Sequence, residues 1–299
     1  MRKQKTKLLI YGAGVIGCLY AAAFSKAGYD TTVYARGKKL EALKRCGLQY
    51  EKNGKTYKAD VNVIGMLQND DAYDFIFLTV RENQVHTALE ELKLNNSANI
   101  VTMVNTLEPY GNWENLCGRG RIIPAFPGAG GSYENNVLKA DFTPPLIQAT
   151  TFAEIDGSKS ERLKKLAAIF KTARVSYRIV KDMHAWQVCH LALVVPLADA
   201  YYKAENPEAV WKEPNVMNET ARQIKSNFQK LYRSGVKLSP PKMHLFRLLP
   251  VGILQSILTP IFKSRFAHIF MYRHSMNARD EMKELHDQFY GYLKELQRA

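Results

Sequence analysis

Cysteine is scarce in this sequence, and its few cysteines form no recognisable pair or cluster. Among 299 residues there are four, at widely spaced positions: Cys18, Cys46, Cys117 and Cys189. No Cys-x-x-Cys pair is present, and no His/Cys cluster has the spacing of a zinc site. We therefore expect neither a disulfide framework nor a metal centre, and free thiols fit a reducing compartment such as the cytoplasm.

A long uninterrupted hydrophobic run is also missing. Segment 243–262 is notably apolar, but it is interrupted by Arg247, Pro250, Gly252, Gln255 and Pro260. A membrane span needs about 20 predominantly apolar residues. We therefore expect no span and favour a buried or interfacial helical hairpin, with membrane contact as the alternative. The N-terminus, residues 1–14, is basic and then apolar, but its apolar part is short and leads into glycines rather than a signal-peptide cleavage site.

Acidic residues are outnumbered by basic ones. The chain has 42 Lys and Arg against 28 Asp and Glu, a formal net charge of +14. The basic residues are spread along the chain, and no zinc-knuckle, RNP-type or basic-zipper pattern accompanies them. We therefore expect no nucleic-acid partner, while a dinucleotide phosphate and a small anionic substrate would suit such a surface.

Short apolar strands alternate with helical segments in the first half of the chain. The predicted strands are 7–11, 31–35, 74–80, 99–104, 121–126 and 145–155. Near-continuous apolar strands that alternate with helices predict a mostly parallel sheet with helices on both faces. From about residue 182 helical periodicity replaces the strand signal, and the predicted helices are 182–204, 215–234 and 264–297.

A glycine motif follows the first predicted strand. Its residues match the pattern GxGxxG and are Gly12, Ala13, Gly14, Val15, Ile16 and Gly17. In such a motif the first glycine permits a tight turn, the second lets a pyrophosphate approach the backbone, and the third lets helix and strand pack closely. The helix that begins here would offer its N–H groups to the phosphates. This context predicts a dinucleotide-binding site, and a purely structural glycine turn is the alternative.

The second predicted strand ends in a basic sequence. A site that prefers NAD has Asp or Glu here to accept a hydrogen bond from the ribose 2′-hydroxyl. This chain has Arg36 instead, followed by Lys38 and Lys39. An arginine can pair with a 2′-phosphate and stack on adenine. We therefore predict NADP(H) as the cofactor, and a solvated basic turn is the alternative.

The length and these patterns together predict two domains. At roughly 150 residues per domain, 299 residues suggest two. We predict an α/β fold, with a Rossmann-type NADP-binding domain at 1–175 followed by an all-helical substrate and dimerisation domain at 176–299.

These features together resemble the ketopantoate reductase family, in which a Rossmann domain precedes a helical domain and the active site lies between them. Two further stretches extend the resemblance: Thr79-Val80-Arg81-Glu82-Asn83-Gln84-Val85 and Asn105-Thr106. The family usually has Lys at the position of Arg81 and Asn-Gly where Asn105-Thr106 stands. The resemblance implies cofactor contacts for Arg81 and Asn105, and a substrate contact for Asn105. A surface salt-bridging arginine and a turn or helix cap are the alternatives.

The helix from residue 182 departs from the family. Counting back from Pro196-Leu197 places Gln187 where the family has its catalytic Lys, and Leu191 where it has an Asn. Glutamine cannot donate a proton as an ammonium group can. His190 lies three residues from Gln187 on the same face and is our candidate general acid. A packed structural histidine is the alternative.

Two residues near the C-terminus match the family's substrate site. Ser275-Met276 resembles a Ser-Met pair whose Ser helps to hold the substrate, and Asp287 stands twelve residues further on, where the family has a Glu. Asp287 keeps the carboxylate on a shorter side chain. The resemblance implies substrate binding by Ser275 and a catalytic role for Asp287, while a solvated helix face is the alternative.

The resemblance implies an NADPH-dependent oxidoreductase that reduces a 2-oxo acid by hydride transfer in the interdomain cleft. With the family activity kept, the reaction would convert ketopantoate to pantoate for pantothenate biosynthesis. The cofactor carries the difficult chemistry, so loss of the family's Lys does not forbid reduction, although it puts ketopantoate itself in doubt. The alternative is an NADP(H)-binding sensor or regulatory protein without hydride transfer. The resemblance is also compatible with a homodimer.

Overall fold

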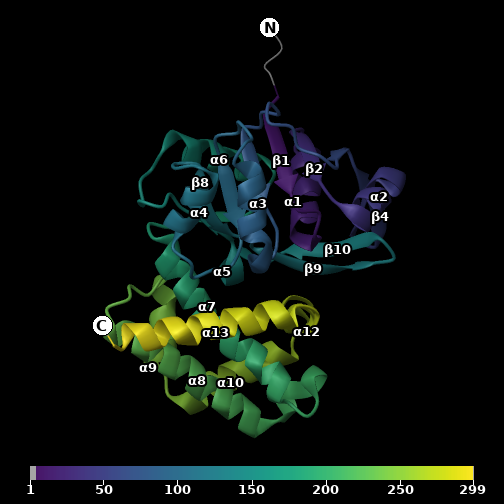
Figure 1. The fold of residues 1–299 in the computed structure, drawn as a ribbon. Coiled ribbons are helices and arrows are strands. Elements are labelled where there is room, and N and C mark those ends of the chain that lie inside the picture. The colour runs from purple at the N-terminus through teal and green to yellow at the C-terminus, as the bar shows by residue number, and fades with distance from the viewer. Residues whose placement is uncertain (1–4, 299) are drawn as a thin grey trace. The chain divides into compact units, whose positions relative to one another are not determined.

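The structure, a computed structural model, describes residues 5–298. The chain divides into two compact units (Figure 1). Within the described residues, the first unit comprises 5–104 and Glu108–Met183, and the second comprises Asn105–Leu107 and 184–298. The first unit has a mostly parallel sheet with helices, and the second is helical. The predicted fold class, a Rossmann-type α/β part followed by a helical part, is confirmed.

The main sheet of the first unit has eight strands. They are β1 (Lys7–Tyr11), β2 (Asp30–Tyr34), β5 (Asn62–Ile64), β6 (Phe75–Leu78), β7 (Ile100–Met103), β8 (Ile122–Phe126), β11 (Thr150–Phe152) and β12 (Tyr177–Ile179). Their order in the sheet is β12-β11-β8-β7-β6-β1-β2-β5. All neighbouring strands from β8 across the sheet to β5 run parallel to one another. The chain order reverses on either side of β1, and the carboxyl ends of the strands at such a point are where open α/β sheets bind ligands.

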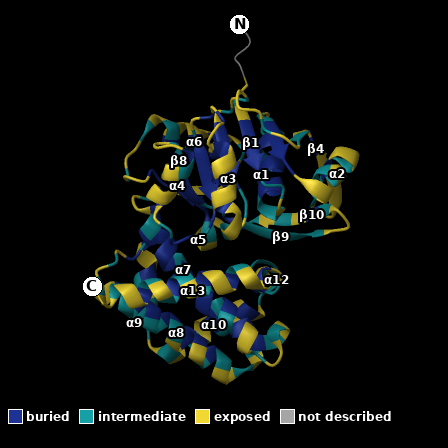
Figure 2. Cartoon of the chain, viewed as in Figure 1, coloured by how far each residue is buried: buried dark blue, intermediate teal, exposed yellow. Residues whose placement is uncertain are grey.

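Helices cover both faces of this sheet. They are α1 (Val15–Lys26), α2 (Gly37–Cys46), α3 (Val85–Leu92), α4 (Tyr110–Cys117), α5 (Pro145–Gln148) and α6 (Glu161–Thr172), with a short turn η1 (Glu82–Gln84) before α3. The rings of Phe24 on α1 and Phe170 on α6 lie 5.8 Å apart in one core. Figure 2 shows the central strands as buried, which explains their near-continuous apolar sequences.

A second, four-stranded sheet packs against α1 and was not predicted. Its strands are β3 (Leu48–Lys52), β4 (Lys55–Ala59), β9 (Ala129–Glu134) and β10 (Val137–Phe142), in the order β4-β3-β10-β9. Two tight hairpins build it, with positive φ angles at Asn53-Gly54 and Asn135-Asn136. The strand predicted at 145–155 is also shorter than expected, because Pro145–Gln148 forms α5 and only Thr150–Phe152 pairs in the sheet.

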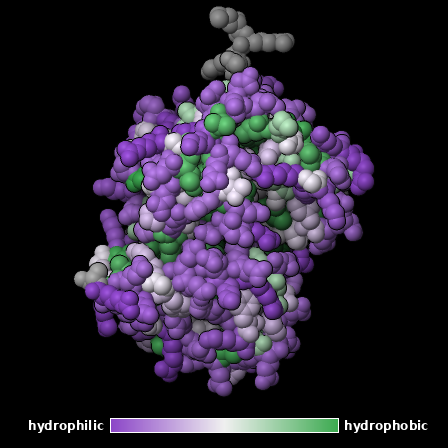
Figure 3. Space-filling view, in the orientation of Figure 1, coloured by the Kyte–Doolittle hydropathy of each residue, from purple (hydrophilic) through white to green (hydrophobic). Residues whose placement is uncertain are grey.

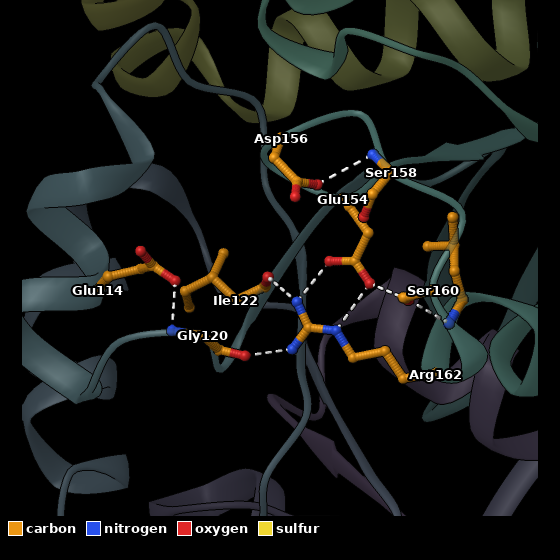
Figure 4. Close-up of polar contacts among 9 residues, drawn as sticks. Glu114, Gly120, Ile122, Glu154, Asp156, Ser158, Ser160 and Arg162 are labelled. Carbon is orange, nitrogen blue, oxygen red and sulfur yellow. Dashed lines mark hydrogen bonds and ion pairs between the residues drawn. The ribbon is translucent and has the colours of Figure 1, made fainter.

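A buried ion pair connects β11 to α6 (Figure 4). Glu154 is 4% exposed, and Arg162 donates to its carboxylate from Nε over 2.8 Å and from Nη2. The same guanidinium donates to the carbonyl groups of Gly120 and Ile122, at the start of β8. Burial acts to raise the pKa of Glu154, but the hydrogen bonds from Arg162 and Ser160 outweigh it and hold that pKa below its usual range. This network fixes the end of the sheet.

The second unit is built from helices. They are α7 (Met183–Lys203), α8 (Pro214–Arg233), α9 (His244–Leu248), α10 (Val251–Lys263), α11 (Arg265–Ala267), α12 (Arg273–Asn277) and α13 (Arg279–Leu296), joined in part by the short turns η2 (Pro207–Lys212), η3 (Pro241–Met243) and the π-helical η4 (His268–Tyr272). Their shared core includes Val188, Phe228, Leu258 and Phe289.

The apolar segment 243–262 is divided between α9 and α10, and α10 packs on α8. Leu254, Leu258 and Phe262 of α10 are buried, whereas Ile253, Ile257 and Ile261 are 47%, 45% and 38% exposed. None of the helices between residues 5 and 298 combines the length and apolar character that crossing a membrane requires. The face of the chain drawn in Figure 3 is predominantly hydrophilic, with hydrophobic residues scattered in small groups.

Candidate cofactor and active site

The glycine turn lies between β1 and α1, and each of its glycines has a distinct surrounding. Gly12 has φ +114°, and a Cβ there would lie 2.8 Å from the carbonyl oxygen of Thr79. A Cβ on Gly17 would lie 2.1 Å from the carbonyl oxygen of Gly12. A Cβ on Gly14 would meet no atom of the described residues within 4 Å. Gly12 and Gly17 are therefore needed for folding, while the exposed Gly14 leaves open space before α1.

Hydrogen bonds tie three strand ends around this turn. The hydroxyl of Thr79, just after β6, donates to the carbonyl of Gly12 over 2.8 Å. The N–H of Gly12 donates to the carbonyl of Tyr34 at the end of β2 over 3.4 Å. The glycine turn, the residues after β2 and the residues after β6 are thereby brought to one edge of the sheet. Arg36 and Arg81 follow those two strands.

Arg36 is the centre of a polar cluster at the end of β2. Its Nε donates to the Tyr34 hydroxyl over 2.9 Å, and its Nη2 lies 2.6 Å from a carboxylate oxygen of Glu91 on α3. Nη2 also donates to the Tyr11 hydroxyl, which itself donates to Glu91. The guanidinium carbon lies 5.8 Å and 5.2 Å from the ring centres of Tyr11 and Tyr34. Half of the Arg36 side chain stays exposed.

Burial and the hydrogen bond to Glu91 raise the pKa of Tyr11, so this phenol stays protonated and acts as a donor. Tyr11, Tyr34 and Glu91 are not among the site residues predicted from the sequence. The two tyrosines end the first two strands, so the strand pattern could have pointed to them. No sequence pattern indicated a role for Glu91, because only the packing of α3 on the sheet brings it close to Arg36.

Arg81 and Asn105 follow neighbouring strands, β6 and β7. Arg81 is exposed, and its N–H donates to the side-chain oxygen of Gln84 over 3.3 Å. Asn105 is half-buried and belongs to the helical unit by its packing. Its Oδ1 atom is buried and has no hydrogen-bond partner among residues 5–298. A buried acceptor without a donor is unusual in a folded protein, and it can receive a hydrogen bond from a ligand.

Gln187 and His190 lie on α7. Gln187 is buried, with 1% of its surface exposed. The imidazole of His190 stacks on the indole of Trp186, with the ring centres 5.1 Å apart. Burial, aided by the nearby His274, lowers the pKa of His190 to about 3. This imidazole is therefore neutral at physiological pH, which is unfavourable for the general-acid role predicted from the sequence.

Ser275 and Asp287 occupy different surroundings in the helical unit. Ser275 on α12 is 4% exposed, and its carbonyl accepts a hydrogen bond from the Tyr202 hydroxyl over 2.7 Å. Asp287 on α13 is exposed. Its neighbour His286 lies 3.1 Å from a carboxylate oxygen of Asp199 on α7, a pair that the sequence did not reveal. Within residues 5–298 the structure shows no group of three or more His, Cys, Asp or Glu side chains that could hold a metal ion.

The strand order and the glycine turn define a Rossmann-type, dinucleotide-binding architecture, which is followed by a helical second unit. Residues 8–136 match the family model described as ketopantoate reductase PanE/ApbA. The 2-dehydropantoate 2-reductase of Archaeoglobus fulgidus is 27% identical over 234 residues, 75% of this chain and 74% of that protein. The enzyme of that name from Mesorhizobium japonicum is 32% identical over 102 residues, 33% of this chain and 31% of that protein. The chain is therefore similar to ketopantoate reductases, and these relatives support an oxidoreductase.

Solved structures share the fold along nearly the whole chain. The 2-dehydropantoate 2-reductase of Geobacter metallireducens superimposes with a TM-score of 0.68 at 14% identity, covering 98% of this chain and 99% of that one. A D-mandelate dehydrogenase solved with NADH and anilino(oxo)acetate gives a TM-score of 0.62 at 13% identity, covering 98% of this chain and 99% of that one. The matching family model and the dehydrogenase solved with NADH imply a nicotinamide dinucleotide cofactor.

Proposed function

We propose that this protein is an NADPH-dependent reductase of a small 2-oxo acid. The observation that carries the proposal is the open glycine turn before α1 together with Arg36 at the end of β2. Ketopantoate is the first substrate to test, because the relative from Archaeoglobus fulgidus is named 2-dehydropantoate 2-reductase. Its product would be pantoate, on the route to pantothenate. In this proposal residues 1–175 bind the cofactor, and residues 176–299 hold the substrate.

The first unit fits a dinucleotide phosphate on its own residues. The space beside Gly14 admits a pyrophosphate to the N–H groups at the start of α1, where the helix dipole favours negative charge. The half-exposed Arg36 would pair with a ribose 2′-phosphate, which NADPH has and NADH lacks. Arg81 and the unpaired Oδ1 of Asn105 would contact the nicotinamide end, where an amide N–H would satisfy that oxygen.

Reduction of a carbonyl adds a hydride to its carbon and a proton to its oxygen, and bound NADPH would supply the hydride. The Gln187 amide would donate a hydrogen bond that polarises the carbonyl, but it has no proton to give. His190 is neutral at pH 7 and would also act as a hydrogen-bond donor. In this proposal Ser275 holds the substrate, and Asp287 takes part in proton delivery through water.

The alternative function is an NADP(H)-binding protein, and its motive lies in α7. The sequence predicts Gln187 and Leu191 at the positions of the family's Lys and Asn, and both side chains are buried. A chain with an intact glycine turn and this α7 would bind NADP(H) without transferring a hydride, and would act as a sensor or regulator.

The first experiment is to follow NADPH oxidation with ketopantoate and then with a panel of other 2-oxo acids. Turnover that depends on one of these acids supports the reductase. If NADPH binds and no acid on the panel is reduced, the reductase is abandoned in favour of the binding protein.

Cofactor binding is tested with Gly14→Ala. Gly14 has φ −73° and no neighbour near its missing Cβ, so alanine fits the fold, but its methyl group would fill the space proposed for the pyrophosphate. We expect the Kd for NADPH to rise by about tenfold or more with an unchanged Tm. Gly111→Ala on α4, which is equally unobstructed, is the control and should bind NADPH as the wild type does. Unchanged NADPH binding by Gly14→Ala would refute the site.

A further inference from the structure

The helical unit contains a pocket that is separate from every residue discussed above as a site residue. Its volume is about 360 Å³, within the range of about 300–1,000 Å³ that is common for small-molecule sites. The pocket is formed by the end of α7, by η2, by the end of α10 and by the turn through α11 and η4. Neither the glycine turn nor Gln187, His190, Ser275 or Asp287 lines it.

The walls of this pocket are aromatic. They are formed by Tyr201, Trp211, Phe262 and Tyr272. The ring centre of Tyr201 lies 5.1 Å from that of Phe262 and 5.6 Å from that of Tyr272. Aromatic faces and edges at such separations form favourable contacts with a further planar ring.

Tyr201 lines the pocket, and its hydroxyl is buried without a partner among the described residues. The residue as a whole is 2% exposed. Buried polar groups in native proteins are nearly always hydrogen-bonded. A ligand with a polar atom in the pocket would supply the missing bond.

Two cationic side chains and a histidine line the pocket close together in the chain. Lys263, Arg265 and His268 are exposed lining residues within six positions of the chain. Of the described residues that line the pocket, Glu208 alone is acidic, and its carboxylate accepts a hydrogen bond from the Tyr272 hydroxyl over 3.2 Å. His268 and Tyr272 stack on each other at the two ends of the π-helical turn η4, a type of turn that is frequent at functional sites.

We propose that this pocket binds a small planar aromatic carboxylate as a ligand separate from the cofactor and the reduced substrate. Its ring lies against the aromatic walls, its carboxylate faces Lys263 and Arg265, and a polar atom pairs with the Tyr201 hydroxyl. The charge of the ligand is essential, because the two cations would otherwise gain nothing from its binding.

The test uses the full-length protein, saturated with NADP⁺ so that the dinucleotide site is blocked, and ligand-observed NMR. The probes are 2-naphthoate and the uncharged 2-naphthalenemethanol, which share a ring system and differ in charge. We expect 2-naphthoate to bind with a Kd of about 1 mM or lower, and the alcohol to bind at least about fivefold more weakly. Equal affinities for the two probes would overturn the proposal.

Substitutions of lining residues test whether 2-naphthoate binds in this pocket. The double variant Lys263→Ala/Arg265→Ala changes only exposed side chains, and it should weaken 2-naphthoate by about fivefold or more while leaving the alcohol unchanged. The matched control is Lys237→Ala/Lys283→Ala, two exposed lysines of the same unit that do not line the pocket. If the double variant Lys263→Ala/Arg265→Ala binds 2-naphthoate as the control does, the pocket is not its site.

Discussion

Arg36 is held by one carboxylate and two phenols at the end of β2. Glu91, Tyr11 and Tyr34 each form a hydrogen bond in this cluster, and the side chain of Arg36 is still half exposed. A phosphate that binds to Arg36 therefore meets a carboxylate on the same guanidinium. Because like charges repel, Glu91 weakens the site for a doubly charged group while it keeps the arginine in place.

Two substitutions separate these effects. Arg36→Gln should raise the Kd for NADPH by about tenfold, the equivalent of one charge-assisted hydrogen bond, and should leave the Kd for NADH unchanged. Glu91→Gln keeps the shape of the side chain and removes its charge, so NADPH should bind a few-fold more tightly. Titration with both cofactors at one ionic strength measures the selectivity. Equal changes for NADPH and NADH in Arg36→Gln would show that Arg36 does not contact the 2′-phosphate.

His190 makes the stability of the protein depend on pH. Its folded pKa of about 3 lies below the ordinary histidine value of 6.5, so between these values the unfolded chain binds more protons than the folded one. The free energy of unfolding therefore falls as the pH drops below about 6.5. His190→Gln should reduce this fall between about pH 6.5 and 4.5, as measured by urea unfolding across that range. Parallel pH profiles for wild type and variant would contradict the low pKa.

The residues of the candidate site differ in how far the sequence could reveal them. Gly12, Gly14 and Gly17 stand in a fixed local order that backbone geometry requires, so a motif identifies them. Glu91 is distant from Arg36 in sequence, and only helix packing brings the two together. The burial of His190 likewise depends on its neighbours on other helices, and the helical spacing that suggested an acid could not reveal it.

At the scale of elements, the Glu154–Arg162 pair fastens α6 to the sheet. Arg162→Met would leave the Glu154 carboxylate buried without its partner and should lower the free energy of unfolding by about 3–5 kcal/mol. The double variant Arg162→Met/Glu154→Gln also removes the unpaired negative charge of Glu154 and should recover part of this loss of stability. Chemical denaturation of the wild type, the single variant and the double variant tests the prediction. Equal stability of the single and double variants would mean that the unpaired charge does not cause the loss of stability.

The helix α10 has a buried apolar face and an exposed apolar face. Two adjacent residues, Ile257 and Leu258, represent the two faces. Leu258 is 4% exposed and belongs to the core of the helical unit, whereas Ile257 is 45% exposed. Leu258→Ala should cost about 2–5 kcal/mol of stability through the cavity it leaves. Ile257→Ala, the matched control, should change stability by less than about 1 kcal/mol. Similar losses for both variants in thermal unfolding would show that the exposed face is covered.

The elements that the sequence revealed are those whose pattern follows from their own burial. Strands such as Phe75–Leu78 are buried throughout, and their apolar run is unmistakable. The strand Lys55–Ala59 is exposed along most of its length, so it carries no such run. Its hairpin has a turn signal at Asn53-Gly54, but the flanking residues lack the apolar alternation that would complete a hairpin prediction. Sheet pairing between β3 and β10, which are far apart in sequence, has no local signature.

The whole molecule shares its fold with solved structures that differ from it at most sequence positions. Solved structures at 13% and 14% identity still superimpose along nearly all of the chain. Burial patterns constrain a fold through many residues at once, so it tolerates many substitutions. A catalytic position depends on a single side chain, and the predicted place of Gln187 at the lysine position of ketopantoate reductases would be one such change. The order of an α/β part and a helical part was therefore predictable, while the substrate is left to experiment.

The three residues Asn105–Leu107 leave the first unit and return to it, and Leu107 is part of the core of the helical unit. No single cut of the backbone therefore divides this protein into two whole halves. A fragment that ends at Met183 would carry Leu107 without its packing partners, and a fragment that begins at His184 would lack one side chain of its own interior. During synthesis, the helical half emerges last and has to enclose a loop made long before it.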